Sequence, residues 1–312
     1  MLTKRIDIGE GKMAFTVKFW GVRGSRTVPG KNTLVYGGNT ACVEVRCKEH
    51  RMILDAGTGI CGLIEELMAE KKPIYADLLI SHMHWDHIIG LPFFTPLYQR
   101  SNVFCIRGTN GTTYNFETAL RNIMKDPNFP VSFDAMPSQK IFKTHTVGDV
   151  FNLRKSWEQI LYEDGVEQKN YDVPEVIVTT HRNQHPNGGS FYKLSYEGKS
   201  VCYVSDTECD PDNPQFIEDL ISYVQGCDLL IMDTNYTRDE YEGRVGGFSK
   251  KGWGHSSWQD GVEVAQRAGV KKLCLFHHNA ERTDIEQAEI EKMAQQVFPA
   301  TIAAKEGMII VI

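Results

Sequence analysis

Long apolar segments are missing from this chain of 312 residues. No run in it approaches the roughly 20 consecutive apolar residues that a membrane-spanning helix needs. The first residues, MLTKRIDIGEGKMAF, also lack the apolar centre of a secretory signal peptide. These absences argue against a membrane partner and make the cytoplasm the expected compartment.

Disulfide patterns, repeats and an excess of basic charge are absent too. The eight cysteines are scattered without a CxxC pair, which indicates reduced and mostly buried thiols. A net charge of -6 argues against a broad surface for nucleic acid, although it leaves room for a local basic patch. With 41% hydrophobic and 24% charged residues, the composition is typical of a globular protein. We expect a single domain over residues 1–312.

Short apolar runs alternate with amphipathic segments along the chain. The apolar runs predict strands at 14–20, 41–47, 51–55, 76–81, 103–107, 175–180, 190–196, 200–206, 229–233, 272–276 and 307–312. Helical periodicity predicts helices at 59–71, 86–99, 114–125, 214–225, 256–268 and 284–297. This alternation, with hairpins between some of the strands, favours an α/β unit in which sheets pack face to face with helices outside.

Residues 126–174 are the least regular part of the chain. They contain prolines, a DG pair at 164–165 and scattered charges. This composition predicts an inserted loop or subdomain, and long loops in compact folds are often functional lids.

Residues 80–90, ISHMHWDHIIG, place three histidines and an aspartate within six positions. A strand-like run precedes them and a helix-like segment follows, and loops of this kind commonly carry functional residues. His82 and His84 are two positions apart, so their rings can point the same way. Asp86 and His87 are adjacent and cannot easily join that pair around one tetrahedral ion. Four ligands in this arrangement favour a site for two metal ions over a polar loop that is merely rich in histidine.

Further ligands must then come from elsewhere in the chain. His185 lies in THRNQHPNGGSF, where His181 is its rival, and Asp206 ends the strand-like run SVCYVSD. The pair FHH at 276–278 offers His277 or His278 at another strand end. A lone aspartate at a strand end is more often a turn residue or a cap. Histidine is favoured for zinc and a carboxylate can bridge two ions, so the joint appearance of these residues at strand ends favours a metal centre.

The motif HMHWDH, followed in chain order by His185, Asp206 and His277, resembles the metallo-β-lactamase-fold hydrolases. The resemblance implies a four-layer αββα sandwich with two divalent metal ions at one edge. Zn²⁺ is expected, with Mn²⁺ or Fe as alternatives. By the same resemblance, one ion is held by His82, His84 and His185, the other by Asp86, His87 and His277, and Asp206 bridges them.

The segment GHSSWQDGVEVAQRAGVKKLCLFHH at 254–278 is similar to the ribonuclease Z and phosphodiesterase branch of that family. His255 with Ser256 matches its HST-type histidine, and MDTN aligns with its HEAT-type motif, with Asp233 in place of glutamate. FWGVRGS, YGGNTACVEV and LFHHN resemble bacterial cyclic-nucleotide phosphodiesterase-like members. True β-lactamases of this fold usually carry cysteine where Asp206 stands. Transfer RNA processors carry a protruding basic, glycine-rich arm, which nothing here clearly matches.

The resemblance also suggests catalytic roles. His255 is the candidate general acid for the leaving alkoxide and Asp233 is the residue that orients it, and with Asp86 they form the predicted catalytic set. The alternative for His255 is a place beside a helix N-cap, because Ser256 and Ser257 begin a helix well. Asp55 is expected to accept a hydrogen bond from a ligand histidine, or else to be a turn aspartate.

Substrate contacts are less defined by the sequence. Arg23 and Asn39 border the site by resemblance and could contact substrate phosphate, or they are solvated loop residues. Trp85 could stack on a nucleobase, or pack beside the helix start. Phe93 and Phe94 are assigned to the core.

Together these features predict a dinuclear metal-dependent phosphodiesterase that acts on a small cyclic nucleotide, cAMP or cGMP. The alternative is a ribonuclease Z-type endonuclease that processes tRNA 3′ ends, and the acidic charge counts mildly against such an RNA partner. A non-catalytic metal-binding protein on the same scaffold is a third class. The sequence leaves a homodimer open.

Overall fold

The computed structural model describes residues 15–163 and 173–312. The DG pair at 164–165 lies outside the described residues. The first sheet contains Thr16–Gly21 (β1), Cys42–Cys47 (β2), His50–Leu54 (β3), Tyr75–Leu79 (β4), Val103–Thr109 (β5), Gln139–His145 (β6) and Ile309–Val311 (β14). The second contains Val150–Asn152 (β7), Ile177–Arg182 (β8), Ser190–Tyr196 (β9), Lys199–Val204 (β10), Leu229–Asp233 (β11), Leu273–Phe276 (β12) and Thr301–Ala303 (β13).

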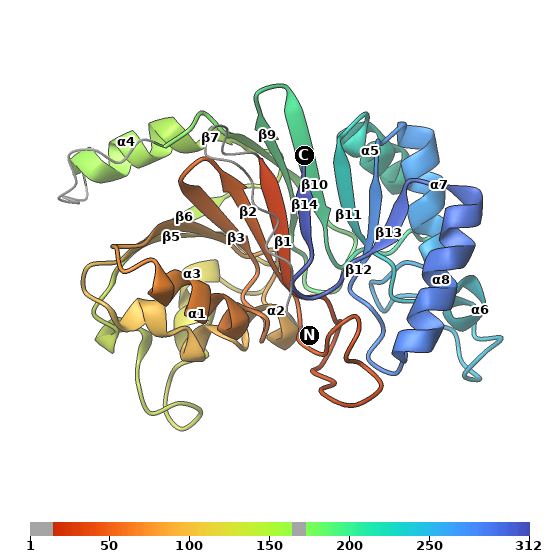
Figure 1. Cartoon of the computed structure of the whole chain (residues 1–312), viewed down its shortest axis with the longest axis horizontal. Coiled ribbons are helices and arrows are strands. Elements are labelled where there is room, and N and C mark those ends of the chain that lie inside the picture. The colour runs from red at the N-terminus through yellow and green to blue at the C-terminus, as the bar shows by residue number, and fades with distance from the viewer. Residues whose placement is uncertain (1–14, 164–172) are drawn as a thin grey trace.

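The two seven-stranded sheets face each other (Figure 1). Their strand orders are β14-β1-β2-β3-β4-β5-β6 and β13-β12-β11-β10-β9-β8-β7. Within the first sheet β3, β4, β5 and β6 run parallel. Within the second, β10, β11, β12 and β13 run parallel. Each sheet therefore has a parallel half, and the carboxyl ends of parallel strands are where α/β folds place their sites.

The α-helices are Ile60–Ala69 (α1), Trp85–Ile88 (α2), Phe116–Asn122 (α3), Leu153–Glu163 (α4), Pro214–Val224 (α5), Arg238–Tyr241 (α6), Trp258–Ala268 (α7) and Asp284–Val297 (α8). Short 3-10 turns cover Leu91–Phe93 (η1), Thr95–Tyr98 (η2) and Phe133–Ala135 (η3). Ser257 begins α7 with a capping box, and Gly269 ends it in the left-handed conformation that glycine adopts without steric cost.

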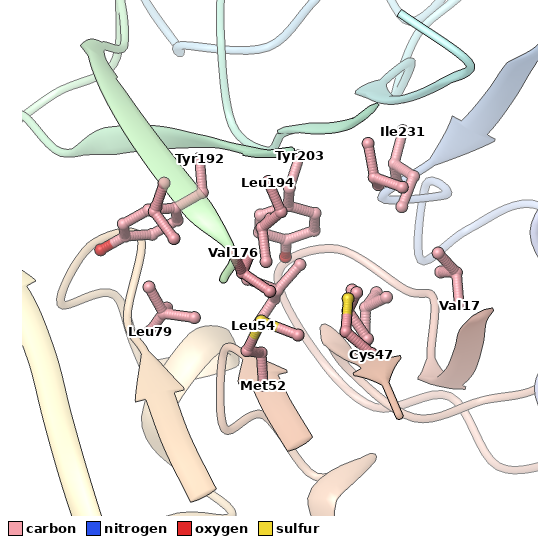
Figure 2. Packing of buried hydrophobic residues seen from close by; sticks show 14 of the residues in the cluster. Val17, Cys47, Met52, Leu54, Leu79, Val176, Tyr192, Leu194, Tyr203 and Ile231 are labelled. Carbon is pink, nitrogen blue, oxygen red and sulfur yellow. The ribbon is translucent and has the colours of Figure 1, made fainter. Parts of the chain in front are cut away.

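Apolar side chains from both sheets fill the space between them. Val17 and Leu54 of the first sheet join Tyr203 and Ile231 of the second in one buried cluster (Figure 2). Separate clusters lie under the outer helices of each sheet. Strand β11, LLIMD, is buried along its whole length because both of its faces are covered. These layers confirm the predicted four-layer αββα sandwich.

The predicted helix over 86–99 is wrong in its extent. Helix α2 ends after one turn, and η1 and η2 follow it. Pro92 and Pro96 interrupt the segment because proline lacks the N–H that a continuing α-helix needs. Phe94 is fully buried, whereas Phe93 is 56% exposed, so its assignment to the core is wrong.

The prediction of an inserted loop or subdomain over 126–174 is wrong for much of this segment. It contributes β6 as the outermost strand of the first sheet and β7 as the outermost strand of the second. It also contributes α4, whose buried residues include Trp157. Strand β6, QKIFKTH, escapes the sequence pattern because a strand at a sheet edge exposes polar residues and loses the apolar run of a central strand.

Two further sequence expectations can be compared with the structure. All eight cysteines are free thiols, and only Cys61 is exposed, in agreement with the prediction. None of the helices in the described ranges is long and apolar enough to cross a membrane.

Asp77 of β4 is the centre of a buried polar network. Its Oδ1 accepts a hydrogen bond from Arg107 Nε of β5 at 2.6 Å, and its Oδ2 accepts one from Trp157 Nε1 of α4 at 2.7 Å. His50 Nε2 of β3 lies 2.7 Å from the same Oδ2. Burial by itself raises the pKa of Asp77, but Arg107 and His50 outweigh it and hold that pKa well below its ordinary value.

Asp77→Asn is expected to lower the free energy of unfolding by about 3 kcal/mol, because it leaves Arg107 as a buried charge without its counter-ion. Urea denaturation at pH 7 measures this change. Glu218→Gln is the control, because Glu218 pairs with Arg267 on the surface and exposed ion pairs contribute little.

The difference between the wild-type chain and Asp77→Asn should also depend on pH. A carboxyl group whose pKa is lowered on folding contributes stability above its unfolded pKa of about 3.9 and loses it as the pH falls. The difference should therefore be full at pH 7 and narrow below about pH 4. A difference that is the same at both pH values would contradict this account.

Candidate metal centre

Three residues of the centre follow strand ends with an unusual backbone conformation. Asp55 follows β3, Asp206 lies two residues after β10, and His277 follows β12. Their φ angles are 62°, 46° and 58°, in the left-handed region that side chains other than glycine rarely adopt. Such conformations concentrate at functional sites, where the surrounding structure holds the strain in place. The strand ends therefore fix the directions of these side chains.

The first group of ligand candidates consists of His82, His84 and His185. One ring nitrogen of each lies within 4.8 Å of the others. His82 and His84 follow β4, and His185 comes from the loop between β8 and β9. The structure thus brings together the three histidines that the sequence assigns to one ion.

The second group consists of Asp86, His87, His277 and Asp206, all buried. Asp86 Oδ2 lies 3.1 Å from His277 Nε2 and 3.4 Å from His87 Nε2. The backbone N–H of Ser25 donates to the same Asp86 oxygen at 2.7 Å, which helps to fix the carboxylate.

Asp206 lies between the two groups and presents one carboxylate oxygen to each. Its Oδ1 is 3.1 Å from His87 Nε2 and 3.2 Å from His277 Nε2. Its Oδ2 is 3.6 Å from His82 Nε2 and 3.8 Å from His185 Nε2. This is the arrangement that a carboxylate bridging two cations requires.

The residues fit a pair of metal ions by an independent test. The Nε2 atoms of His82 and His87 are buried and have no hydrogen-bond partner among the described residues. Buried polar atoms are normally satisfied, so two unsatisfied histidine nitrogens that face the same carboxylate fit a pair of cation sites. Imidazole and carboxylate are suitable donors for Zn²⁺, Mn²⁺ or Fe.

Hydrogen bonds behind the ligands orient the rings. Asp55 Oδ2 lies 2.8 Å from His87 Nδ1 and also accepts a hydrogen bond from Tyr203 Oη at 2.7 Å. Gly254 O lies 2.9 Å from His185 Nδ1. In both histidines Nδ1 is thereby engaged and Nε2 is turned toward the centre, which is how outer partners fix metal-binding histidines.

Burial keeps the first three histidines neutral at pH 7. It lowers the pKa of His82 and His84, and lowers that of His185 to about 4. Burial by itself raises the pKa of Asp206, but His277 and His87 outweigh it and bring that pKa well below its ordinary value. Neutral imidazoles at these three positions and an ionised carboxylate at Asp206 are protonation states that bind metal ions. Burial by itself lowers the pKa of His87, but Asp206, Asp86 and Asp55 outweigh it and raise that pKa, so His87 must lose a proton when an ion binds.

His255 and Asp233 form a pair beside the ligands. Asp233 Oδ2 lies 2.8 Å from His255 Nδ1, and the carboxylate also accepts hydrogen bonds from the backbone N–H groups of Thr207 and Asn235. The His255 ring stacks on His277 with 5.0 Å between ring centroids. Burial by itself lowers the pKa of His255, but Asp233 outweighs it and raises the pKa to about 9. A histidine that is protonated at neutral pH can donate a proton.

Comparison with known families agrees with this site. The model of the beta-lactamase superfamily domain matches residues 50–278. The chain belongs to the beta-lactamase superfamily.

Two curated relatives of this superfamily member are named Ribonuclease Z. The protein from Azobacteroides pseudotrichonymphae is 28% identical over 75% of this chain and 79% of its own length. The one from Lactiplantibacillus plantarum is 26% identical over 79% of this chain and 83% of its own length.

Solved structures share the fold at low sequence identity. The metallo-beta-lactamase fold protein YhfI from Bacillus subtilis has a TM-score of 0.63 at 17% identity, covering 95% of this chain and 99% of its own. The short form of human tRNase Z has a TM-score of 0.60 at 17% identity, with the same coverage. Yeast PDE1 has a TM-score of 0.60 at 13% identity, covering 96% of this chain and 99% of its own.

Arg23 does not have the predicted substrate contact in this superfamily member. Its side chain is fully buried, and its guanidinium donates to the carbonyl oxygens of Gly37, Asn279 and Arg282. These bonds anchor the loop from which Ser25 holds Asp86. Expecting Arg23 at the substrate is therefore wrong, because its buried guanidinium directs its donors to backbone carbonyls and has Asp284 Oδ1 at 3.9 Å from Nη2.

The other candidates are placed as follows. The Asn39 amide donates to Glu306 Oε2 at 3.1 Å and its oxygen accepts from Thr58, so its substrate contact stays a prediction. Trp85 is 60% exposed, so the packing alternative for it is wrong. The rivals His181 and His278 are both engaged elsewhere: His181 Nδ1 lies 3.0 Å from Arg182 O, and His278 Nε2 lies 2.9 Å from Ala304 O.

Sequence reasoning missed one residue next to the centre. Glu208, two positions after Asp206 in SDTE, is 3% exposed and its carboxylate accepts hydrogen bonds from Tyr241 and from the backbone before His255. Its position beside a ligand aspartate was the available signal, but a charged residue after a strand end suggests a solvated turn.

Asp206→Asn is expected to weaken the binding of both metal ions, whereas His185→Ala should weaken only one. The affinity lost should exceed about 100-fold, the upper end of what removing an outer partner costs. Metal content after dialysis against a chelator, with competition titration, measures both. His181→Ala is the matched control and should bind two ions as the wild-type chain does. Loss of a single ion in Asp206→Asn would argue against a bridging carboxylate.

Proposed function

We propose that this protein is a metal-dependent phosphodiester hydrolase with a two-ion centre. The observation that carries the proposal is the position of the His255–Asp233 pair next to Asp206, whose two carboxylate oxygens face the two groups of ligands. His255 Nδ1 lies 3.9 Å from Asp206 Oδ2. Seven ligands alone suit many hydrolytic reactions. A protonated histidine beside them supplies what an alkoxide leaving group needs, since an alkoxide is too basic to depart without a proton.

Each residue of the site has a separate role in the proposed reaction. When bound, two divalent ions would lower the pKa of a water molecule and offset the charge that grows on the phosphoryl oxygens. Asp206 sets the spacing of the two sites through its two oxygens. Asp233 accepts a hydrogen bond from Nδ1–H of His255, which orients the ring so that its Nε2–H points toward the substrate. That proton passes to the leaving alkoxide oxygen, and His255 regains a proton from solvent.

RNA is the first candidate substrate, with processing of tRNA 3′ ends as the reaction. This choice rests on the curated relatives, which are named Ribonuclease Z and are covered over most of their length. It favours the alternative of the sequence analysis over the cyclic-nucleotide reading.

A small cyclic nucleotide is the second candidate, because the charge of the chain suits a small ligand better than a long polyanion. The net charge is -6, and phosphate backbones are attracted mainly by clustered basic residues. Helix α4 extends from the sandwich (Figure 1), but its Arg154 and Lys155 are offset by Glu158 and Glu163. The described part of this helix is therefore no basic arm.

A substrate panel on metal-loaded protein tests the function. It contains precursor tRNA, cAMP, cGMP, bis(4-nitrophenyl) phosphate, a thioester and a β-lactam. We expect turnover of phosphodiesters only, abolished in His82→Ala and retained in the control His181→Ala. Cleavage of precursor tRNA with no hydrolysis of cAMP or cGMP selects the first candidate, and the reverse selects the second. A metal-loaded chain that cleaves no phosphodiester would refute the proposal.

The role of His255 is tested by leaving-group dependence. His255→Ala should reduce kcat for a substrate with an alkoxide leaving group by about 10²–10⁴-fold, the usual contribution of a general acid. It should reduce hydrolysis of bis(4-nitrophenyl) phosphate far less, because nitrophenolate departs without a proton. Asp233→Asn should show the same selectivity to a smaller degree. Equal losses on both substrates would mean that His255 only supports the structure.

A further inference from the structure

Glu208 is a buried carboxylate that the proposed reaction does not use. Its Oε1 accepts hydrogen bonds from Tyr241 Oη at 2.7 Å and from Gly252 N at 2.8 Å. Its Oε2 accepts one from Gly254 N at 2.9 Å and lies 3.0 Å from Gly252 N. The side chain thus binds two backbone N–H groups of residues 252–254 and the phenol of the residue that ends α6.

Residues 252–254 form a turn that two glycines make possible. Gly252 and Gly254 both have φ angles of 83°, which only glycine adopts without strain. A side chain on Gly254 would place its Cβ 2.0 Å from His185 Nδ1. The turn therefore lies directly against a metal ligand, and since its two glycines have no side chains to pack, the hydrogen bonds from Gly252 and Gly254 to Glu208 help to hold it there.

The same turn faces both parts of the site. Gly254 O lies 2.9 Å from His185 Nδ1, and the next residue is His255. From its other side Glu208 donates its own backbone N–H to Gln184 O, at the residue before His185, over 3.0 Å. Glu208 therefore contacts the chain on two sides of His185: at Gln184, the residue before it, and at the turn whose Gly254 O lies against His185 Nδ1.

We propose that Glu208 is a positioning residue for the first metal ion. By fixing the turn at 252–254, it holds Gly254 O where it binds Nδ1 of His185 and so directs Nε2 toward the ion. This inference rests on the two-ion centre of the proposed function. It does not depend on which phosphodiester is hydrolysed.

Glu208→Gln is the direct test, since an amide keeps the size of the side chain but cannot accept hydrogen bonds at both ends. One N–H of the turn would then face an NH₂ group. We expect the affinity for one Zn²⁺ ion to fall about 10–100-fold, as for other outer partners of metal ligands, with the second ion little changed. Competition with a chromogenic chelator measures both affinities without any substrate.

Glu291→Gln is the matched control. Glu291 has the same pattern of contacts, because it accepts hydrogen bonds from Tyr36 Oη at 2.7 Å and from Ala303 N at 3.0 Å, but none from a residue next to a ligand. It should lower the thermal midpoint without changing either Zn²⁺ affinity. A structural role alone would make the two variants behave alike.

A double variant shows whether Glu208 acts through His185. In a His185→Ala chain the ring that the turn positions is gone, so adding Glu208→Gln should cause no further loss of Zn²⁺ affinity. If Glu208→Gln does not fold, Glu208→Asp keeps the charge but is too short to reach both glycines, and it should also weaken one ion.

The outcomes are distinguishable from those for the proposed function. Wild-type affinity for both ions in the Glu208 variants, equal weakening of both ions, or additive losses with His185→Ala would each overturn the positioning role. Selective loss of one ion would support it even in a chain that hydrolyses no phosphodiester on the panel. The absence of phosphodiester hydrolysis would refute the proposed function and leave the positioning role of Glu208 supported.

Discussion

The carboxylate of Asp206 is the feature on which the rest of the centre depends. It is 1% exposed and has histidine nitrogens on both of its oxygens, at 3.1–3.2 Å on one side and 3.6–3.8 Å on the other. A buried carboxylate is costly unless cations or donors surround it. Four histidines from distant parts of the chain satisfy that requirement, and in doing so they define two adjacent cation sites.

The sandwich makes this arrangement possible because it holds strained strand ends in place. Left-handed conformations at Asp55, Asp206 and His277 cost about 1–3 kcal/mol each, and the buried strands before them supply the rigidity that sustains this cost. The carboxylate that contacts Nδ1 of each histidine then affects the chemistry of its ring. Asp55 contacts Nδ1 of His87 and leaves its Nε2 facing the centre, whereas Asp233 raises the pKa of His255, the proposed proton donor. In the proposed function, similar carboxylate–histidine contacts thus serve metal binding in one place and proton transfer in the other.

The buried residues of the site bear on the chemistry of the reaction, whereas the exposed residues near them would bear on the choice of substrate. The ligands and the His255–Asp233 pair favour the chemistry of phosphodiester hydrolysis, and they would serve RNA and cyclic nucleotides equally. The choice of substrate would then depend on exposed residues near the ligands, and Trp85, between the ligand candidates His84 and Asp86 in sequence, is 60% exposed. Trp253 and Phe248, about half exposed near His255 in sequence, are of the same kind. Aromatic side chains of this type stack on nucleobases with little preference for sequence.

Much of the fold could be predicted from the sequence because central strands such as β11 are continuous apolar runs. The edge strand β6 was missed because its exposed face breaks that pattern, and prolines ended the helix predicted over 86–99. The spacing of His82, His84, Asp86 and His87 alone determined that two ions were favoured, since neighbouring side chains point in different directions.

The tertiary structure decided which distant residues meet, because the spacing of residues along the sequence does not show this. It selected His185 over His181 and His277 over His278, buried Arg23 against backbone carbonyls, and gave Glu208 its contacts with the turn before His255. Each of these depends on which loops meet at the sheet edge. Local sequence determines the direction in which a side chain leaves its strand, but the partner that it meets lies far away in the sequence. His255 and Asp233 are 22 residues apart, and His277 and Asp86 are 191 residues apart.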